Sequence, residues 1–112
     1  MKVRALGEAV DATSVANQTA VDFTAFTTPF MPGRKVVAVV SPLSILSGNA
    51  ATAATSKVQG SDDGVTYVDL LTCAAGAGKM AEVTLYNYMR FGVTVAAGSA
   101  STLNAYLLAD SV

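Results

Sequence analysis

The residues of this chain that could do chemistry are few, and the most visible are the adjacent carboxylates Asp62 and Asp63. Two carboxylates can act as acid and base on a glycosidic bond when roughly 5 to 9.5 Å separates them across that bond. Neighbouring aspartates directly before Gly64 instead favour a tight turn, because aspartate hydrogen-bonds nearby backbone and glycine accepts positive φ. We therefore predict a turn at Asp62, Asp63 and Gly64. Calcium ligation by the pair is an alternative, although the oxygen-rich pattern of an EF-hand loop is missing.

The sequence contains no histidine. Histidine is the side chain that most often moves protons near neutral pH and is the commonest metal ligand, so its absence excludes Ser/His/Asp and Cys/His arrangements and most zinc sites. The single Cys73 cannot form an internal disulfide, and its apolar neighbours predict a small buried side chain rather than a reactive thiol. We expect no enzymatic activity, no cofactor, no metal and no small-molecule substrate.

Gly76, Gly78 and Ala81 match the GxGxxA pattern of a dinucleotide-binding turn. That pattern requires a helix after it, whereas the following EVTLYNYMRFGVTV has the alternation of β-strands, so we predict a hairpin connection here. The seven Lys and Arg residues are scattered and the formal net charge is −1. Nucleic-acid binding is therefore not expected, because it requires a concentrated basic surface.

Alternating apolar and polar residues predict strands through the C-terminal half, in KVQGSDDGVTYVDLL from Lys57, KMAEVTLYN from Lys79, YMRFGVTVAAG from Tyr88 and STLNAYLLAD from Ser101. The earlier RKVVAVVS from Arg34 is apolar on both faces, which predicts a strand that is buried on both sides. Strands at about ten-residue spacing, joined by glycine-rich turns, predict an all-β fold. We expect an antiparallel β-sandwich or a jelly-roll-like barrel.

Residues 1–33 are less regular, and Pro29 and Pro32 interrupt any central strand there. We expect an extended, irregular N-terminal arm with a first strand over 1–33 and a β-sandwich body over 34–112, within a single domain overall. The simplest interpretation of the aromatic residues is packing in the core and at sheet edges. If those of the arm are exposed, they would instead suit anchors into a partner protein. The candidate contact residues are Val21, Phe23, Phe26, Phe30 and Met31.

The composition favours a subunit that packs against other proteins. Of the 112 residues only 13% are charged, about half the usual share of a globular domain. A weakly charged surface promotes association, so we expect a subunit that lies packed against other protein. The N-terminus lacks the usual form of a signal peptide and no apolar run has transmembrane length, so we expect synthesis in a host cytoplasm and no membrane partner.

From Lys57 to Asp110, the succession KVQGSDDGVTYVDL, YMRFGVTV and LNAYLLAD resembles small β-sandwich virion proteins of tailed bacteriophages, most closely capsid decoration, or cement, proteins. The resemblance implies a structural protein at the capsid surface of the virion that binds the major capsid protein and stabilises the shell. It also implies a homo-oligomer, a dimer or a trimer. The same features also resemble discoidin-like and carbohydrate-binding sandwiches. A glycan-binding module and a tail or fibre component are therefore alternatives.

Overall fold

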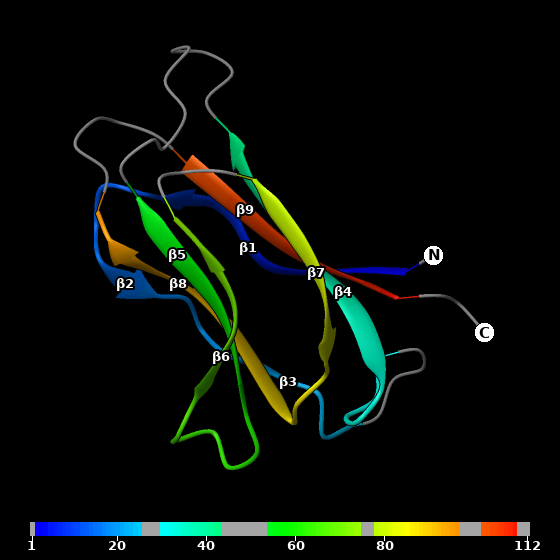
Figure 1. Ribbon diagram of the computed structural model, residues 1–112. Helices are drawn as coiled ribbons and strands as arrows, with labels where there is room; N and C mark the ends of the chain where they lie inside the picture. The colour runs from blue at the N-terminus through cyan, green and yellow to red at the C-terminus, as the bar shows by residue number, and fades with distance from the viewer. Residues whose placement is uncertain (1, 26–29, 44–53, 75–77, 97–101, 110–112) are drawn as a thin grey trace.

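The computed structural model describes residues 2–25, 30–43, 54–74, 78–96 and 102–109, and every regular element in these ranges is a β-strand (Figure 1). The predicted contact residue Phe26, together with Pro29 and Gly76, lies outside the described residues. The strands are β1 (Lys2–Asp11), β2 (Ala16–Asn17), β3 (Val21–Asp22), β4 (Lys35–Leu43), β5 (Thr55–Ser61), β6 (Val68–Cys73), β7 (Lys79–Thr84), β8 (Tyr88–Val95) and β9 (Thr102–Ala109).

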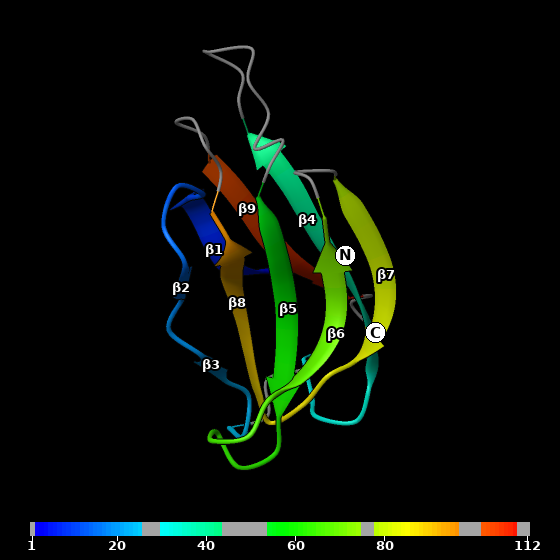
Figure 2. The same ribbon diagram turned by 60° about the vertical axis from the view of Figure 1, so that its left-hand side comes forward.

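The strands form two antiparallel sheets that face each other (Figures 1 and 2). The first sheet has the order β1-β9-β4-β7. The second has the order β2-β8-β5-β6, and β3 also pairs with β8. The predicted antiparallel β-sandwich is therefore confirmed.

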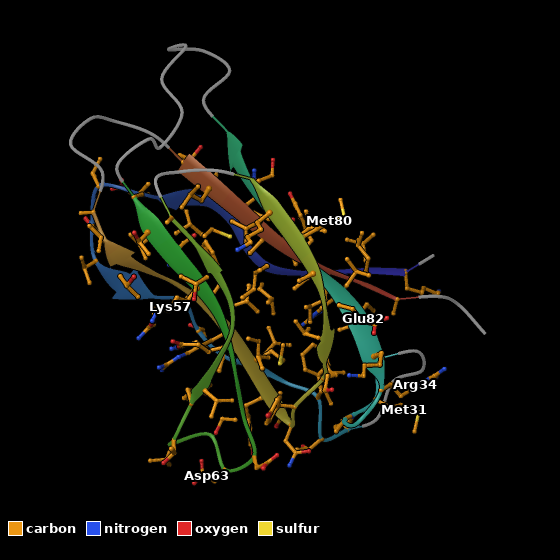
Figure 3. The ribbon with its side chains drawn as sticks, in the orientation of Figure 1. Met31, Arg34, Lys57, Asp63, Met80 and Glu82 are labelled. Carbon is orange, nitrogen blue, oxygen red and sulfur yellow. The ribbon has the colours of Figure 1, made fainter. Side chains whose placement is uncertain are left out.

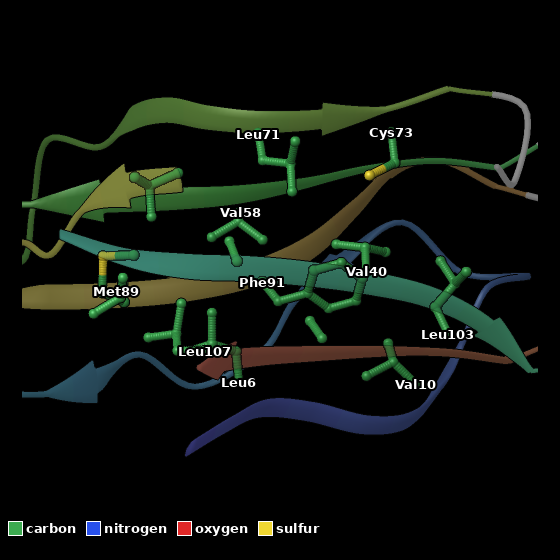
Figure 4. Packing of buried hydrophobic residues seen from close by; sticks show 14 of the residues in the cluster. Leu6, Val10, Val40, Val58, Leu71, Cys73, Met89, Phe91, Leu103 and Leu107 are labelled. Atoms are coloured by element: carbon green, nitrogen blue, oxygen red, sulfur yellow. The ribbon is translucent and has the colours of Figure 1, made fainter. Parts of the chain in front are cut away.

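The core lies between the sheets and follows the alternation of the sequence. On β8, Met89, Phe91 and Val93 are buried, and on β9 the same holds for Leu103, Ala105 and Leu107. Phe91 lies at the centre of this packing (Figure 4). Burying one such side chain contributes about 1.5–3 kcal/mol, so these inward faces determine which side of each strand meets the other sheet.

Strand β4 is buried on one face only, which corrects the prediction from its sequence. Val36, Ala38 and Val40 are buried, whereas Val37 and Val39, on the opposite side, are partly exposed. The physical reason is that the sandwich has two layers. Among the described residues, no third layer covers the outer face of the first sheet.

Fourteen of the first 33 residues lie in β1, β2 and β3, which pair within the two sheets, and this corrects the prediction of an extended arm. Strand β1 pairs with β9 from Lys2 opposite Ala109 to Asp11 opposite Thr102, and it buries Leu6 and Val10. Further along, β2 and β3 pair with β8. The N-terminal segment therefore contributes an edge strand and part of the core.

An irregularity in β1 explains why its strand pattern was hidden. The pairing with β9 shifts register between Ala5 and Gly7 and again between Gly7 and Val10. Within the second shift, Ala9 has a φ of 48° and its N–H donates a 2.8 Å hydrogen bond to Oδ1 of the buried Asn104. Extra residues in a bulge break the two-residue period on which the sequence argument depends.

Candidate functional site

The predicted contact residues that the structure describes, Val21, Phe23, Phe30 and Met31, do not form an exposed anchor. Phe23 and Phe30 are 7% and 8% exposed, and their ring centroids lie 6.0 Å apart within the core. Val21 packs partly buried against that core, and Met31 is also partly buried. Phe23 and Phe30 therefore close the interior of the sandwich, which agrees with core packing, and they lack the exposure that a partner anchor would need.

The structure places Asp62, Asp63 and Gly64 in the loop between β5 and β6. Oδ1 of Asp63 accepts three hydrogen bonds of 2.8 to 2.9 Å, from Val65 N, Thr66 N and Ser61 Oγ. These bonds, that from Thr66 first, lower the pKa of the Asp63 carboxyl. Gly64 takes a φ of 77°, in the left-handed region that favours glycine. The Asp63 carboxylate thus organises the loop.

Two further observations bear on chemistry. Cys73 is buried, as predicted, and burial raises the pKa of its thiol. Within the described ranges, no three His, Cys, Asp or Glu side chains gather to hold a metal ion. The same ranges contain no helix of the length and apolarity that a membrane crossing requires.

The outer face of the first sheet presents a continuous apolar surface, which we call the apolar face. Cross-strand partners share a side of a sheet, so the register gives two rows of side chains running across the strands. One row joins Val3, Leu108 and Val37, and the other joins Ala5, Tyr106, Val39 and Met80. These seven residues, Val3, Ala5, Val37, Val39, Met80, Tyr106 and Leu108, define the apolar face.

The apolar face is accessible and has a charged margin. Met80 and Val3 are 68% and 59% exposed, and the other five side chains are partly exposed. A depression beside Met80 is lined by Val37, Leu108, Lys35 and Glu82. Met80 and Glu82 both lie on β7, at the side of the molecule away from Lys57 (Figure 3).

The size of this surface makes it the leading candidate for an interaction site. Four strands at about 4.8 Å spacing make the patch roughly 14 Å wide between the axes of its outer strands. Single exposed apolar residues are ordinary, whereas the largest contiguous apolar patch of a soluble protein is often an interaction surface.

Sequence reasoning missed the apolar face as a site. The available signal is the continuous apolar run in RKVVAVVS, which by itself predicts burial on both faces of the strand. In the structure, half of that signal belongs to the core and half to the outer surface.

The outer face of the second sheet is polar by contrast. Its side chains include Lys57 and Gln59 from β5, Asp69 from β6 and Arg90 from β8. The two outer faces therefore differ in chemistry, although both belong to the same small sandwich.

Comparison with known proteins locates a similar fold. No protein-family model and no curated protein matches the chain. Among solved structures, the crystal structure of the PBSX exported protein XepA is similar, with a TM-score of 0.61 and 19% sequence identity over 99% of this chain. The chain spans 37% of the length of XepA. This likeness shows a shared fold for a part of that protein.

Proposed function

We propose that this protein is a non-enzymatic structural component of a phage particle, and that it binds the outside of the capsid shell as a decoration protein. Its fold resembles part of an exported protein of PBSX, a phage, which supports a phage-related role. The major capsid protein is the partner in this proposal. The location is the surface of the virion.

The observation that carries the proposal is the apolar face. A protein that works by adhesion needs a rigid, accessible surface with few charges to desolvate. Val37 and Val39 on β4 and Leu108 on β9 meet this need, because β4 pairs with β7 on one side and with β9 on the other. Standard interfaces bury about 800 Å² per partner. The apolar face with its margin of Lys35 and Glu82 supplies the centre of such an area.

The charges at the margin suit the rim of an interface. Lys35 and Glu82 are exposed and flank the depression beside Met80. Polar groups at a rim contribute to orientation, while the desolvated centre contributes most of the affinity. We therefore assign the binding energy to the apolar centre and the alignment on the shell to these two charges.

The test is co-sedimentation of purified protein with assembled, undecorated shells. Val39→Asp places a charge at the centre of the apolar face, and an unpaired buried charge costs on the order of 3 kcal/mol, which corresponds to roughly a 100-fold loss of affinity. Val65→Asp is the matched control, because Val65 is 82% exposed on the β5–β6 loop and the charge change is identical. We expect the control to bind like the unaltered protein.

Equal binding of the two variants would contradict docking through the apolar face. Sedimentation equilibrium of the free proteins tests whether a second copy of the chain, in a dimer or trimer, occupies this surface instead. If Val39→Asp dissociated an oligomer but left shell binding unchanged, the apolar face would belong to self-association and the docking proposal would be wrong.

A further inference from the structure

The outer face of the second sheet carries a chain of mutually fixed polar side chains. Lys57 Nζ lies 2.7 Å from Asp69 Oδ2, and Gln59 Nε2 donates a 2.7 Å hydrogen bond to Asp69 Oδ1. Arg90 Nε in turn donates a 2.9 Å hydrogen bond to Gln59 Oε1. The guanidinium carbon of Arg90 lies 3.7 Å from the ring centroid of Tyr67. Three strands and a loop thus hold five side chains in one arrangement.

Two sets of donors on this face, the terminal amino groups of Arg90 and the side-chain amide of Asn17, have no hydrogen-bond partner among the described residues. Arg90 uses Nε for Gln59, and neither of its two terminal amino groups is bonded within the described chain. The side chain of Asn17, on β2, lies over Gly92, where a Cβ would come within 3.1 Å of Asn17 Cγ. The Asn17 amide also has no hydrogen-bond partner within the described ranges.

The register brings these donors together. Gly92 pairs with Asn17 on one side and with Lys57 on the other, and Arg90 lies two residues before Gly92 on the same side of β8. Because Gly92 has no side chain, the Asn17 amide lies over the backbone of β8, in the same cross-strand row as Lys57. With Asp69 included, this group of side chains carries a local formal charge of +1.

We propose that this face binds an acidic saccharide, a sugar chain that bears carboxylates, with Arg90 and Asn17 as the main contacts. A guanidinium with two available amino groups matches a carboxylate in two parallel hydrogen bonds. The Asn17 amide and the Asp69 carboxylate supply a donor and an acceptor for neighbouring hydroxyl groups. A ligand that combines hydroxyls with negative charge fits this set better than an apolar partner does.

Recognition here depends on hydrogen bonds and charge rather than on stacked rings. The tyrosines do not gather on one face: Tyr106 lies on the apolar face, and Tyr86 packs against the core. Tyr67 holds the Arg90 guanidinium in position. Because these side chains are held in place before binding, less conformational entropy is lost when a ligand binds. This lower cost favours binding at a small, open site, where few contacts are made.

The test is an NMR titration of the isotope-labelled full chain at physiological salt, with trigalacturonic acid as the probe. Its methyl ester, which has the same hydroxyls and no carboxylate charge, is the matched ligand control. We expect the free acid to shift the amide signals of Asn17, Lys57, Arg90 and Gly92, and the ester to bind roughly tenfold more weakly or not at all, because it loses the charge-assisted pair.

Two variants separate specific binding from general attraction. We expect Arg90→Gln to weaken binding of the acid at least about tenfold, whereas Arg34→Gln, which removes the same charge from an exposed residue far from Lys57 (Figure 3), leaves it unchanged. Asn17→Ala is a second variant that leaves the Arg90 network intact.

Three outcomes would each overturn the proposal: absence of shifts, equal binding of acid and ester, or equal losses in the Arg34 and Arg90 variants. Shell docking uses the other sheet and stands or falls independently.

Discussion

At the scale of single residues, the loop built by Asp63 shows how far local chemistry can be predicted. Aspartates before a glycine indicate a turn in any sequence, because the hydrogen bonds involved join residues only two or three positions apart. The contacts of Asn17 and Arg90 depend instead on strands that are distant in sequence. No local sequence pattern predicts these contacts.

Acid should destabilise the protein partly through Asp63. Hydrogen bonds hold the pKa of its carboxyl below the ordinary value, so the unfolded chain binds more protons as the pH falls below about 4. Stability from this group is therefore complete above that pH and is lost as the pH falls through the folded-state pKa. We expect Asp63→Asn to flatten the dependence of urea midpoints on pH between about 4 and 2.

Other carboxyls contribute to the same acid response, so the slope should shrink in the variant without vanishing. Lowered pKa values are also found at Asp11, Asp22 and Asp69. Parallel slopes for Asp63→Asn and the unaltered protein would show that the loop carboxylate contributes nothing to folding.

Asn104 should stabilise the bulge in β1. Its buried side chain accepts the Ala9 N–H at 2.8 Å, and losing the partner of a part-buried donor costs about 1–3 kcal/mol. We expect Asn104→Ala to lower the free energy of unfolding by that amount in denaturant titrations. A change below roughly 0.5 kcal/mol, the scale of ordinary surface substitutions, would mean that water replaces the bond without loss.

At the scale of elements, predictability followed the regularity of the strands. The alternation in β8 and β9 agrees with their buried residues from Met89 to Val93 and from Leu103 to Leu107, whereas a register shift in the pairing of β8 with β5 leaves Val95 exposed. The sequence pattern does not predict strand β1, because two register shifts interrupt the two-residue period there. The strand β4 was predicted correctly but its burial on both faces was not, because a sequence cannot say whether a second apolar face packs inside the same molecule.

Strand β1 should be required for folding, in contrast to a detachable arm. Leu6 is 4% exposed against the core, and truncating such a side chain to alanine costs about 2–5 kcal/mol. We expect Leu6→Ala to lose that much stability in urea unfolding. Val3→Ala, on the outer side of the same strand, should change stability by less than about 0.5 kcal/mol.

The truncated chain gives the stronger version of this experiment. Deletion of residues 2–30 removes β1 together with Phe23 and Phe30 from the core, so we expect it to abolish the cooperative unfolding transition. A folded, stable body after this deletion would restore the idea of an independent arm and contradict the role given to β1.

At the scale of the whole molecule, the two sheets turn different chemistry outward. The first presents Val39, Met80 and Leu108, and the second presents Lys57, Asp69 and Arg90. A thin sandwich with one apolar and one polar outer side is suited to lie on a surface with the apolar side down. The sequence predicted the sandwich and its weak charge, but the division between two sides depends on strand order, which long-range pairing determines.

The central claim is that the apolar face lies against the capsid shell, and Met80 offers the most direct measurement of it. Met80 is 68% exposed in the free protein, so mild peroxide should convert it readily to the sulfoxide. The rate of this oxidation, followed by peptide mass spectrometry, can be compared between free and shell-bound protein. The account predicts that shell binding slows Met80 oxidation roughly fivefold or more, because the side chain becomes buried. An unchanged rate in protein that is demonstrably bound to shells would contradict it.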